Sequence, residues 1–142
     1  MMNSHYQFLA QTKKCFAFLE PRGFQVESER ETGYGSFAGG FHIIYASKGV
    51  TVVVGYGCAE LEVTFKRGTI SADYLFLDHN LHANASGLAG NMFPLDKLAP
   101  VIDVIAKDIE INYDDVLRGD SVVWRTIEKL ILTQRERKPF LP

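Results

Sequence analysis

The sequence predicts a single α+β domain: an N-terminal helix, an antiparallel meander of four to five strands, and two to three C-terminal helices packed on one face. Residues of one helical face recur near both ends of the chain, and apolar residues alternate with polar ones in the middle. Short turns that contain glycine separate the alternating segments. A length of 142 residues fits one domain over 1–142 and can bury a core without metals or disulfides.

The first helix begins where Ser4 and Gln7 have the spacing of a capping box. The residues that then share one helical face are Phe8, Leu9, Thr12, Cys15, Phe16 and Leu19. Pro21 and Gly23 end the helix, since neither continues it comfortably. We expect Phe16, in the middle of this face, to lie in the core.

A half-exposed strand follows the first helix. The segment FQVESERE alternates at Phe24, Val26 and Ser28 against charged or polar neighbours. The next segment, TGYGSFAGG, has four glycines between Thr32 and Gly40, and we expect a flexible connection there.

The middle of the chain predicts the centre of the sheet. The segments FHIIYA and VTVVVGY flank a tight turn at Ser47-Lys48-Gly49, and both are rich in β-branched residues. The segment LEVTFK directs Leu61, Val63 and Phe65 inward before Arg67-Gly68 turns the chain. A fifth strand is expected around Tyr74–Leu77, and the following HANASGLAGN is typical of a loop.

The C-terminal part returns to helical spacing at Leu95, Leu98, Ile102, Ile105 and Ile109. Pro100 lies inside this pattern, so we expect a short turn before it or a kink. Asn112 and Asp115 suit the cap and third position of a further helical turn, and Asp120 suits the cap of the last helix. Residues 135–142 are expected to form a frayed tail.

The composition excludes several classes of protein. Hydrophobic residues make up 46% of the chain, too many for a disordered protein. A net charge of −2 gives no general basic field for nucleic acid. The first residues lack a basic start followed by an apolar run, so we expect no leader sequence, and no apolar stretch approaches the ~20 residues of a membrane span. We therefore expect a cytoplasmic protein with neither nucleic acid nor membrane as a partner.

The segment DHNLH carries the most suggestive polar side chains. A helical zinc site needs histidines four residues apart, whereas His79 and His82 are three apart and no cysteine or carboxylate cluster has ligand spacing with them. We interpret the segment as a polar loop and expect no metal and no cofactor. An enzyme or small-ligand protein that uses the 34–41 and 79–82 loops stays open as an alternative.

Other reactive motifs are weak. No nucleophile elbow is present, and neither Cys15 nor Cys58 has a histidine close in sequence, so we assign no catalytic residue. The segment GYGSFAGG has the glycines of a phosphate loop without their order. Tyr34 and Phe37 in this segment are candidate anchors for a partner, because aromatic side chains on loops often serve as such; folding back onto the sheet edge is the alternative.

Charge is distributed unevenly along the chain. From Asp73 to Asp120, nine acidic residues oppose three basic ones, a net of −6. From Arg125 to Lys138, five basic residues oppose two acidic ones, a net of +3. An acidic surplus without a metal-loop pattern either keeps the surface solvated or faces a basic partner. The candidate partner-binding residues in it are Asp108, Glu110, Asp114, Asp115 and Asp120.

The segments FLEPRGFQVE, FHIIYASKGVTVVVGY with LEVTF, and FPLDKLAPVIDVI together cover about two thirds of the chain. Their layout resembles the small bacterial immunity proteins of polymorphic-toxin and contact-dependent inhibition systems. The resemblance implies a non-catalytic cytoplasmic protein that occludes a toxin, often through acidic residues when the toxin is a nuclease. A secretion chaperone or adaptor is the alternative within the class of binding proteins, and the oligomeric state stays open.

Overall fold

The computed structural model describes residues 4–31, 41–57, 60–81 and 98–137. The elements, in chain order, are α1 (Ser4–Cys15), the 3-10 helix η1 (Ala17–Arg22), β1 (Gln25–Glu31), β2 (Phe41–Ala46), β3 (Thr51–Gly57), β4 (Glu60–Arg67), β5 (Ile70–Asp73), α2 (Tyr74–Asn80), α3 (Leu98–Asn112), α4 (Asp114–Leu117) and α5 (Ser121–Arg137). This order is the α+β layout that the sequence predicts.

The five strands form one antiparallel sheet in the order β1-β2-β3-β4-β5. The expected central position of the second and third strands is confirmed, since β3 lies in the middle and β2 beside it. The tight turn between them is also confirmed: the Ser47 N–H donates to the Val50 carbonyl at 3.0 Å, and Gly49 has a φ of 91°. Such a φ favours glycine, which has no Cβ to clash with the backbone.

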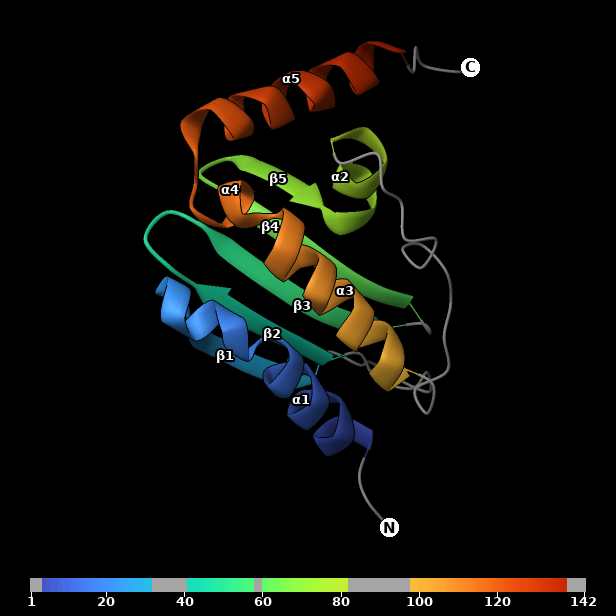
Figure 1. Ribbon diagram of the computed structural model, residues 1–142. Helices are drawn as coiled ribbons and strands as arrows, with labels where there is room; N and C mark the ends of the chain where they lie inside the picture. Colours follow the sequence, from blue (N-terminus) through green and yellow to red (C-terminus); the bar gives the residue numbers. More distant parts are fainter. Residues whose placement is uncertain (1–3, 32–40, 58–59, 82–97, 138–142) are drawn as a thin grey trace.

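One face of the sheet carries the core. Helices α1 and α3 lie side by side over this face, and α5 lies beyond β5 (Figure 1). The inward side chains of the three middle strands are buried: Phe41, Ile43, Tyr45, Val52, Val54, Val63 and Phe65. Side chains of Glu62, Lys66 and Ser71 alternate to the opposite face and are exposed. The molecule is therefore a layer of helices on a sheet.

The first helical segment is divided in two. Helix α1 ends at Cys15, and the chain continues as η1, which contains Pro21 and ends at Gly23 with a φ of 93°. The predicted end of the helix at Pro21 and Gly23 is thus the end of a 3-10 helix. Phe16 is 1% exposed and stacks against Phe18, so its expected place in the core is confirmed.

A register shift in β1 changes the expected alternation. Val26 lies opposite Tyr45, whereas Ser28 lies opposite Ile44, so Glu27 between them is the extra residue of a bulge. The prediction that Phe24, Val26 and Ser28 share one face is therefore wrong at Ser28, because one inserted residue moves all following side chains to the other face.

The predicted fifth strand lies earlier than expected. Strand β5 spans Ile70–Asp73, and the residues expected as a strand, Tyr74–Leu77, begin helix α2. The reason is a cap: the Asp73 carboxylate accepts the backbone N–H of Phe76 at 2.8 Å, which starts a helix where the strand stops. Tyr74 and Leu77, three residues apart, then share the buried face of that helix.

The expected kink at Pro100 does not interrupt the helix, and the alternative, a short turn before Leu98, falls on residues outside the described ranges. Pro100 is the third residue of α3, which runs without interruption to Asn112. The first four N–H groups of a helix have no partner within it, so a proline there removes no hydrogen bond.

The last two helices are joined by a cap and a buried tryptophan. Asp120 caps α5 as expected, with Oδ1 accepting the N–H groups of Val122 and Val123 at 2.9 and 3.1 Å. Trp124 is fully buried and donates Nε1–H to the Val116 carbonyl of α4 at 2.9 Å. The cap of α4 is Tyr113 rather than Asn112. Residues 135–137 belong to α5 instead of a frayed tail, and 138–142 lie outside the described residues.

Candidate protein-binding site

Asp108, the first of the predicted partner-binding carboxylates, is half-buried and joins α2 to α3. The Tyr74 hydroxyl donates to its Oδ2 at 2.5 Å, and Asn112 Nδ2 donates to its Oδ1 at 2.7 Å. Hydrogen bonds to a charged acceptor are among the stronger ones in proteins. Asp108 therefore has a structural role that limits what it can offer a partner.

Asp108 borders a buried cluster of aromatic and acidic side chains. The ring of Tyr113 lies 5.6 Å from the rings of both Phe65 and Tyr74. Burial raises the pKa of Tyr113, and the neighbouring Tyr74, Asp108 and Asp78 raise it further. Tyr113 and Asp78 are 0% and 1% exposed, so the cluster is closed to solvent. We interpret it as part of the core rather than a site for a substrate.

The structure corrects the interpretation of DHNLH as a polar loop. Asp78, His79 and Asn80 form the last half of α2, and Asp78 is buried. His82 and residues 34–40 of the 34–41 segment, with Tyr34 and Phe37, lie outside the described residues. Within the described ranges, no group of three histidine, cysteine, aspartate or glutamate residues is placed to hold a metal ion.

Asp114 connects three elements through two arginines. Arg118 Nε donates to its Oδ2 at 2.8 Å, and Arg22 of η1 pairs with its Oδ1. The hydrogen bonds from Arg118 and Arg22 hold the pKa of the Asp114 carboxyl below its usual range. Arg22 also donates to the Glu110 carbonyl at 3.3 Å, near the end of α3. Arginine at a helix C-terminus satisfies free carbonyl groups there, so this contact stabilises the end of α3.

The remaining carboxylates differ in their availability. Asp115 Oδ1 accepts the Val116 N–H at 2.8 Å, and Asp120 caps α5. Glu110 is exposed, and its carboxylate has no ion-pair partner in the part of the chain that the structure describes. The acidic stretch that stands out in the sequence is therefore largely used by the fold, and Glu110 is its freest member.

An exposed apolar stripe lies beside these carboxylates. Val104 and Ile111 are 45% and 74% exposed, and Pro100 and Lys107 are exposed with them. The spacing of four, three and four residues places all four on one side of α3, which we call the α3 outer face. Lys107 Nζ pairs with Asp103 Oδ2 at 3.1 Å.

Helix α3 is therefore apolar on two sides. Its inner side packs into the core through Ile102, Ile105 and Ile109, which are at most 3% exposed. A helix of this kind normally has both sides covered, and exposed apolar groups rimmed by polar ones are typical of protein contacts. The sequence pattern did not predict this face, although Val104 and Ile111 lie seven residues apart and off the core pattern.

Cys15 does not have the environment of a reactive thiol. Burial raises the pKa of its thiol, and the charge of Asp103 raises it further. Its sulfur accepts a hydrogen bond from Gln11 Nε2 at 3.3 Å, and its S–H donates to Asp103 Oδ1 at 3.9 Å. A raised pKa keeps the thiol protonated and lowers its nucleophilicity. Cys58 lies outside the described residues.

Comparison of the chain with family models, curated proteins and solved structures finds no match. Among the described helices, none combines the length and the apolar character needed to cross a membrane.

Proposed function

We propose that this chain is a non-catalytic protein-binding module that docks a partner protein on the α3 outer face. The observation that carries the proposal is the exposure of Val104 and Ile111 on one side of a helix whose other side is core. These side chains stand on a regular helix, so little conformational entropy is lost when they bind. Anchors seven residues apart are the pattern by which a helix inserts into an apolar groove.

Charge indicates the chemistry of the partner. From Asp103 to Asp120, six acidic residues oppose two basic ones, a net of −4, and Arg22 reduces this to −3. Glu110 adjoins Ile111 and is free to meet a cation. The partner surface that fits is an apolar groove with basic residues at its rim, because complementary charge speeds association and fixes register.

In its specific form, the proposal is that the chain is a bacterial immunity protein, acting in the cytoplasm, that neutralises a cognate toxin by occluding it. The resemblance of the N-terminal helix, the hairpin and the α3 segment to such proteins supports this form. A basic toxin domain would complement the acidic residues that lie beside the α3 outer face, such as Glu110. A secretion chaperone or adaptor is the alternative, and it would bind its partner without abolishing the partner's activity.

The test compares variants in binding to a partner captured from the native cells and then purified. Ile111→Ser should weaken binding by roughly 1–4 kcal/mol if Ile111 is an anchor, with little change in folding stability. Val122→Ser is the matched control, since Val122 is 68% exposed but lies on α5. Equal binding by the wild type and Ile111→Ser, with both folded, would contradict the proposal.

A second measurement tests the specific form. If the partner is a toxin, one equivalent of the chain should abolish its activity, and Ile111→Ser should need more protein for the same effect. Glu110→Gln should mainly slow association at low salt, because exposed charges at a rim act on the on-rate. A partner that keeps full activity in the complex would exclude the immunity role and leave the binding proposal intact.

A further inference from the structure

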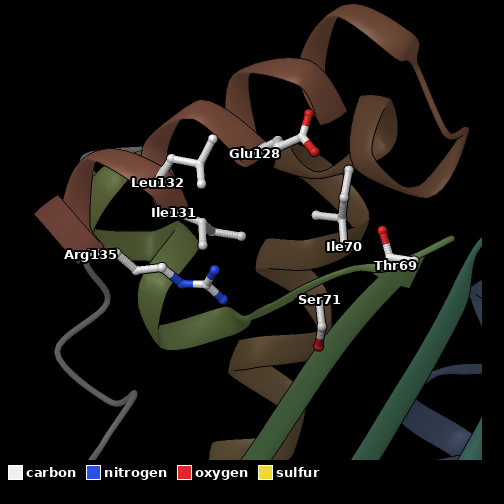
Figure 2. Close-up of a pocket in the computed structure, with 7 residues that line it drawn as sticks. All are labelled: Thr69, Ile70, Ser71, Glu128, Ile131, Leu132 and Arg135. Atoms are coloured by element: carbon white, nitrogen blue, oxygen red, sulfur yellow. The ribbon is translucent and has the colours of Figure 1, made fainter.

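A groove separates the edge strand β5 from the C-terminal half of α5, as Figure 2 shows. Its volume is about 260 Å³. The residues that line it come from the turn before β5, from the start of β5 and from one side of α5: Thr69, Ile70, Ser71, Glu128, Ile131, Leu132 and Arg135. None of these residues belongs to the α3 outer face.

The groove exists because α5 becomes less buried along its length. Trp124 and Ile127 in its first half are 0% exposed, whereas Leu132 is 50% exposed. The four helix residues in the groove follow at intervals of three, one and three, which places them on one side of α5. Ile131 and Leu132 therefore form an apolar wall that the sheet covers only in part.

Opposite charges stand at the two ends of this wall. Glu128 and Arg135 are seven residues apart, about 10 Å along a helix. Neither forms an ion pair within the described part of the chain. In Figure 2 the guanidinium of Arg135 extends from α5 toward the strand side of the groove, while Glu128 lies at the end near Thr69 and Ile70.

The strand side offers backbone groups and the Thr69 hydroxyl. Strand β5 is the last of the sheet and pairs only with β4, so its other edge has no strand partner among the described elements. An antiparallel edge strand directs about half of its backbone N–H and C=O groups away from its neighbour. The exposed Thr69 hydroxyl lies at the Glu128 end of the groove, whereas the Ser71 hydroxyl points away from α5 (Figure 2).

We infer that this groove binds an extended peptide segment of a partner protein, with a basic side chain at Glu128, an apolar side chain against Ile131 and Leu132, and an acidic group on Arg135. Charge complementarity selects such an occupant, because one ligand must satisfy both an anion and a cation about 10 Å apart. A free sheet edge is a common acceptor of extended peptides. The volume lies below the ~300–1,000 Å³ of pockets for drug-sized molecules.

The test uses the full chain and a blocked pentapeptide, acetyl-Lys-Ser-Val-Ser-Glu-amide. Side chains of an extended peptide alternate, so its lysine, valine and glutamate lie on one side, spanning roughly 13 Å. We expect saturable shifts of the backbone amide resonances of Ile70, Ser71, Ile131 and Leu132 on titration. A peptide with glutamine at both ends should bind on the order of fivefold more weakly, as expected for loss of exposed ion pairs.

Matched variants locate the peptide. Arg135→Gln should weaken binding about fivefold, and Arg125→Gln, an exposed change on the same helix outside the groove, should leave it unchanged. Absence of saturable shifts in the groove residues, or equal binding by Arg135→Gln and wild type, would overturn the inference. Equal binding of acetate and the pentapeptide would also overturn it, since the groove would then recognise a simple anion.

A variant that ends at Arg137 tests whether residues 138–142 of the chain itself, rather than a partner peptide, occupy the groove. Equal peptide affinity in this variant and the full chain supports a partner peptide as the ligand. Peptide binding that appears only after removal of residues 138–142 would show that the chain's own C-terminal segment occupies the groove, and would overturn the inference. Both outcomes are independent of the α3 outer face, which shares no residue with the groove.

Discussion

The acidic stretch from Asp108 to Asp120 and the C-terminal half of α5 are both charged surface segments, yet the fold uses them differently. The fold uses three of the aspartates in the acidic stretch: Asp108 accepts a hydrogen bond from a tyrosine, Asp114 pairs with two arginines, and Asp120 caps a helix. Glu128 and Arg135 in α5 form no ion pair among the described residues and face a groove. A dense run of charge in a sequence therefore does not identify the charges that are free to bind.

The position of each segment in the fold explains the difference. Residues 108–120 contain the end of α3, all of α4 and Asp120, which caps α5. Helix ends carry backbone groups without partners, and carboxylates and arginines satisfy them. Glu128 lies in the middle turns of α5, where the backbone groups bond within the helix, so its carboxylate is not needed there.

The largest expected effect separates the anchored half of α5 from its free half. Trp124→Ala should destabilise the protein by ~3–5 kcal/mol, because it empties a fully buried site and removes the hydrogen bond to Val116. Leu132→Ala should change stability by less than ~1 kcal/mol, since Leu132 is half exposed. Urea unfolding measures both. If Trp124→Ala does not fold, Trp124→Phe should still lose more stability than Leu132→Ala. Equal losses of stability at the two positions would contradict the division of α5 into a buried half and an exposed half.

The second effect compares two acidic residues of α3. Asp108→Asn should destabilise the fold by about 1–3 kcal/mol, because the amide nitrogen that replaces one carboxylate oxygen is a donor and cannot accept the hydrogen bond from Tyr74 or Asn112 made there. Glu110→Gln should have an effect near zero. Thermal unfolding at pH 7 provides the comparison. A neutral result for Asp108→Asn would return Asp108 to the set of free surface charges.

A smaller effect is expected at the start of α5. Asp120→Ala removes the acceptor for the N–H groups of Val122 and Val123 and should destabilise by ~0.5–2 kcal/mol. Glu128→Ala, two turns further along the same helix, should be almost neutral. Chemical denaturation of the two variants gives the difference; a larger loss for Glu128→Ala would show that the groove residues also support the fold.

The smallest effect concerns acid. The folded-state pKa of Asp114 is lowered by the hydrogen bonds from Arg118 and Arg22, so its contribution to stability is present above the unfolded pKa of ~3.9. This contribution is lost as pH falls through the lower folded pKa. Since Asp114 is half exposed, we expect no more than ~1 kcal/mol.

Unfolding at pH values from 6 to about 2 tests this expectation. Asp114→Asn should be less stable than the wild type near neutral pH and should approach it in acid. Arg118→Gln should reduce the same acid dependence. Identical pH profiles for Asp114→Asn and the wild type would show that the two arginines contribute no net stability through this carboxylate.

Local patterns were enough to predict most of the fold. The alternating residues Val63 and Phe65 predicted the buried face of β4, and Gly49 and Gly68 predicted two turns. Both predictions succeed because side-chain periodicity and a positive φ are local properties. The cap at Asp120 was likewise predictable. Two predictions about the strands were wrong. A bulge in β1 moved Ser28 to the other face of the strand, and the cap from Asp73 started a helix at Tyr74 where a strand was expected.

The candidate sites depended on contacts between distant residues. Nothing near Asp114 in sequence predicts its pairing with Arg22, 92 residues earlier, and nothing near Asp108 predicts the Tyr74 hydroxyl. The exposure of Ile111 and the groove beside Arg135 likewise depend on which side of each helix the sheet covers. Sequence alone determined the α+β class, the turns and the last helix cap, because these follow from interactions within a few residues. The tertiary structure decided which charges and apolar groups stay free, because a side chain is available only where no other part of the fold has used it.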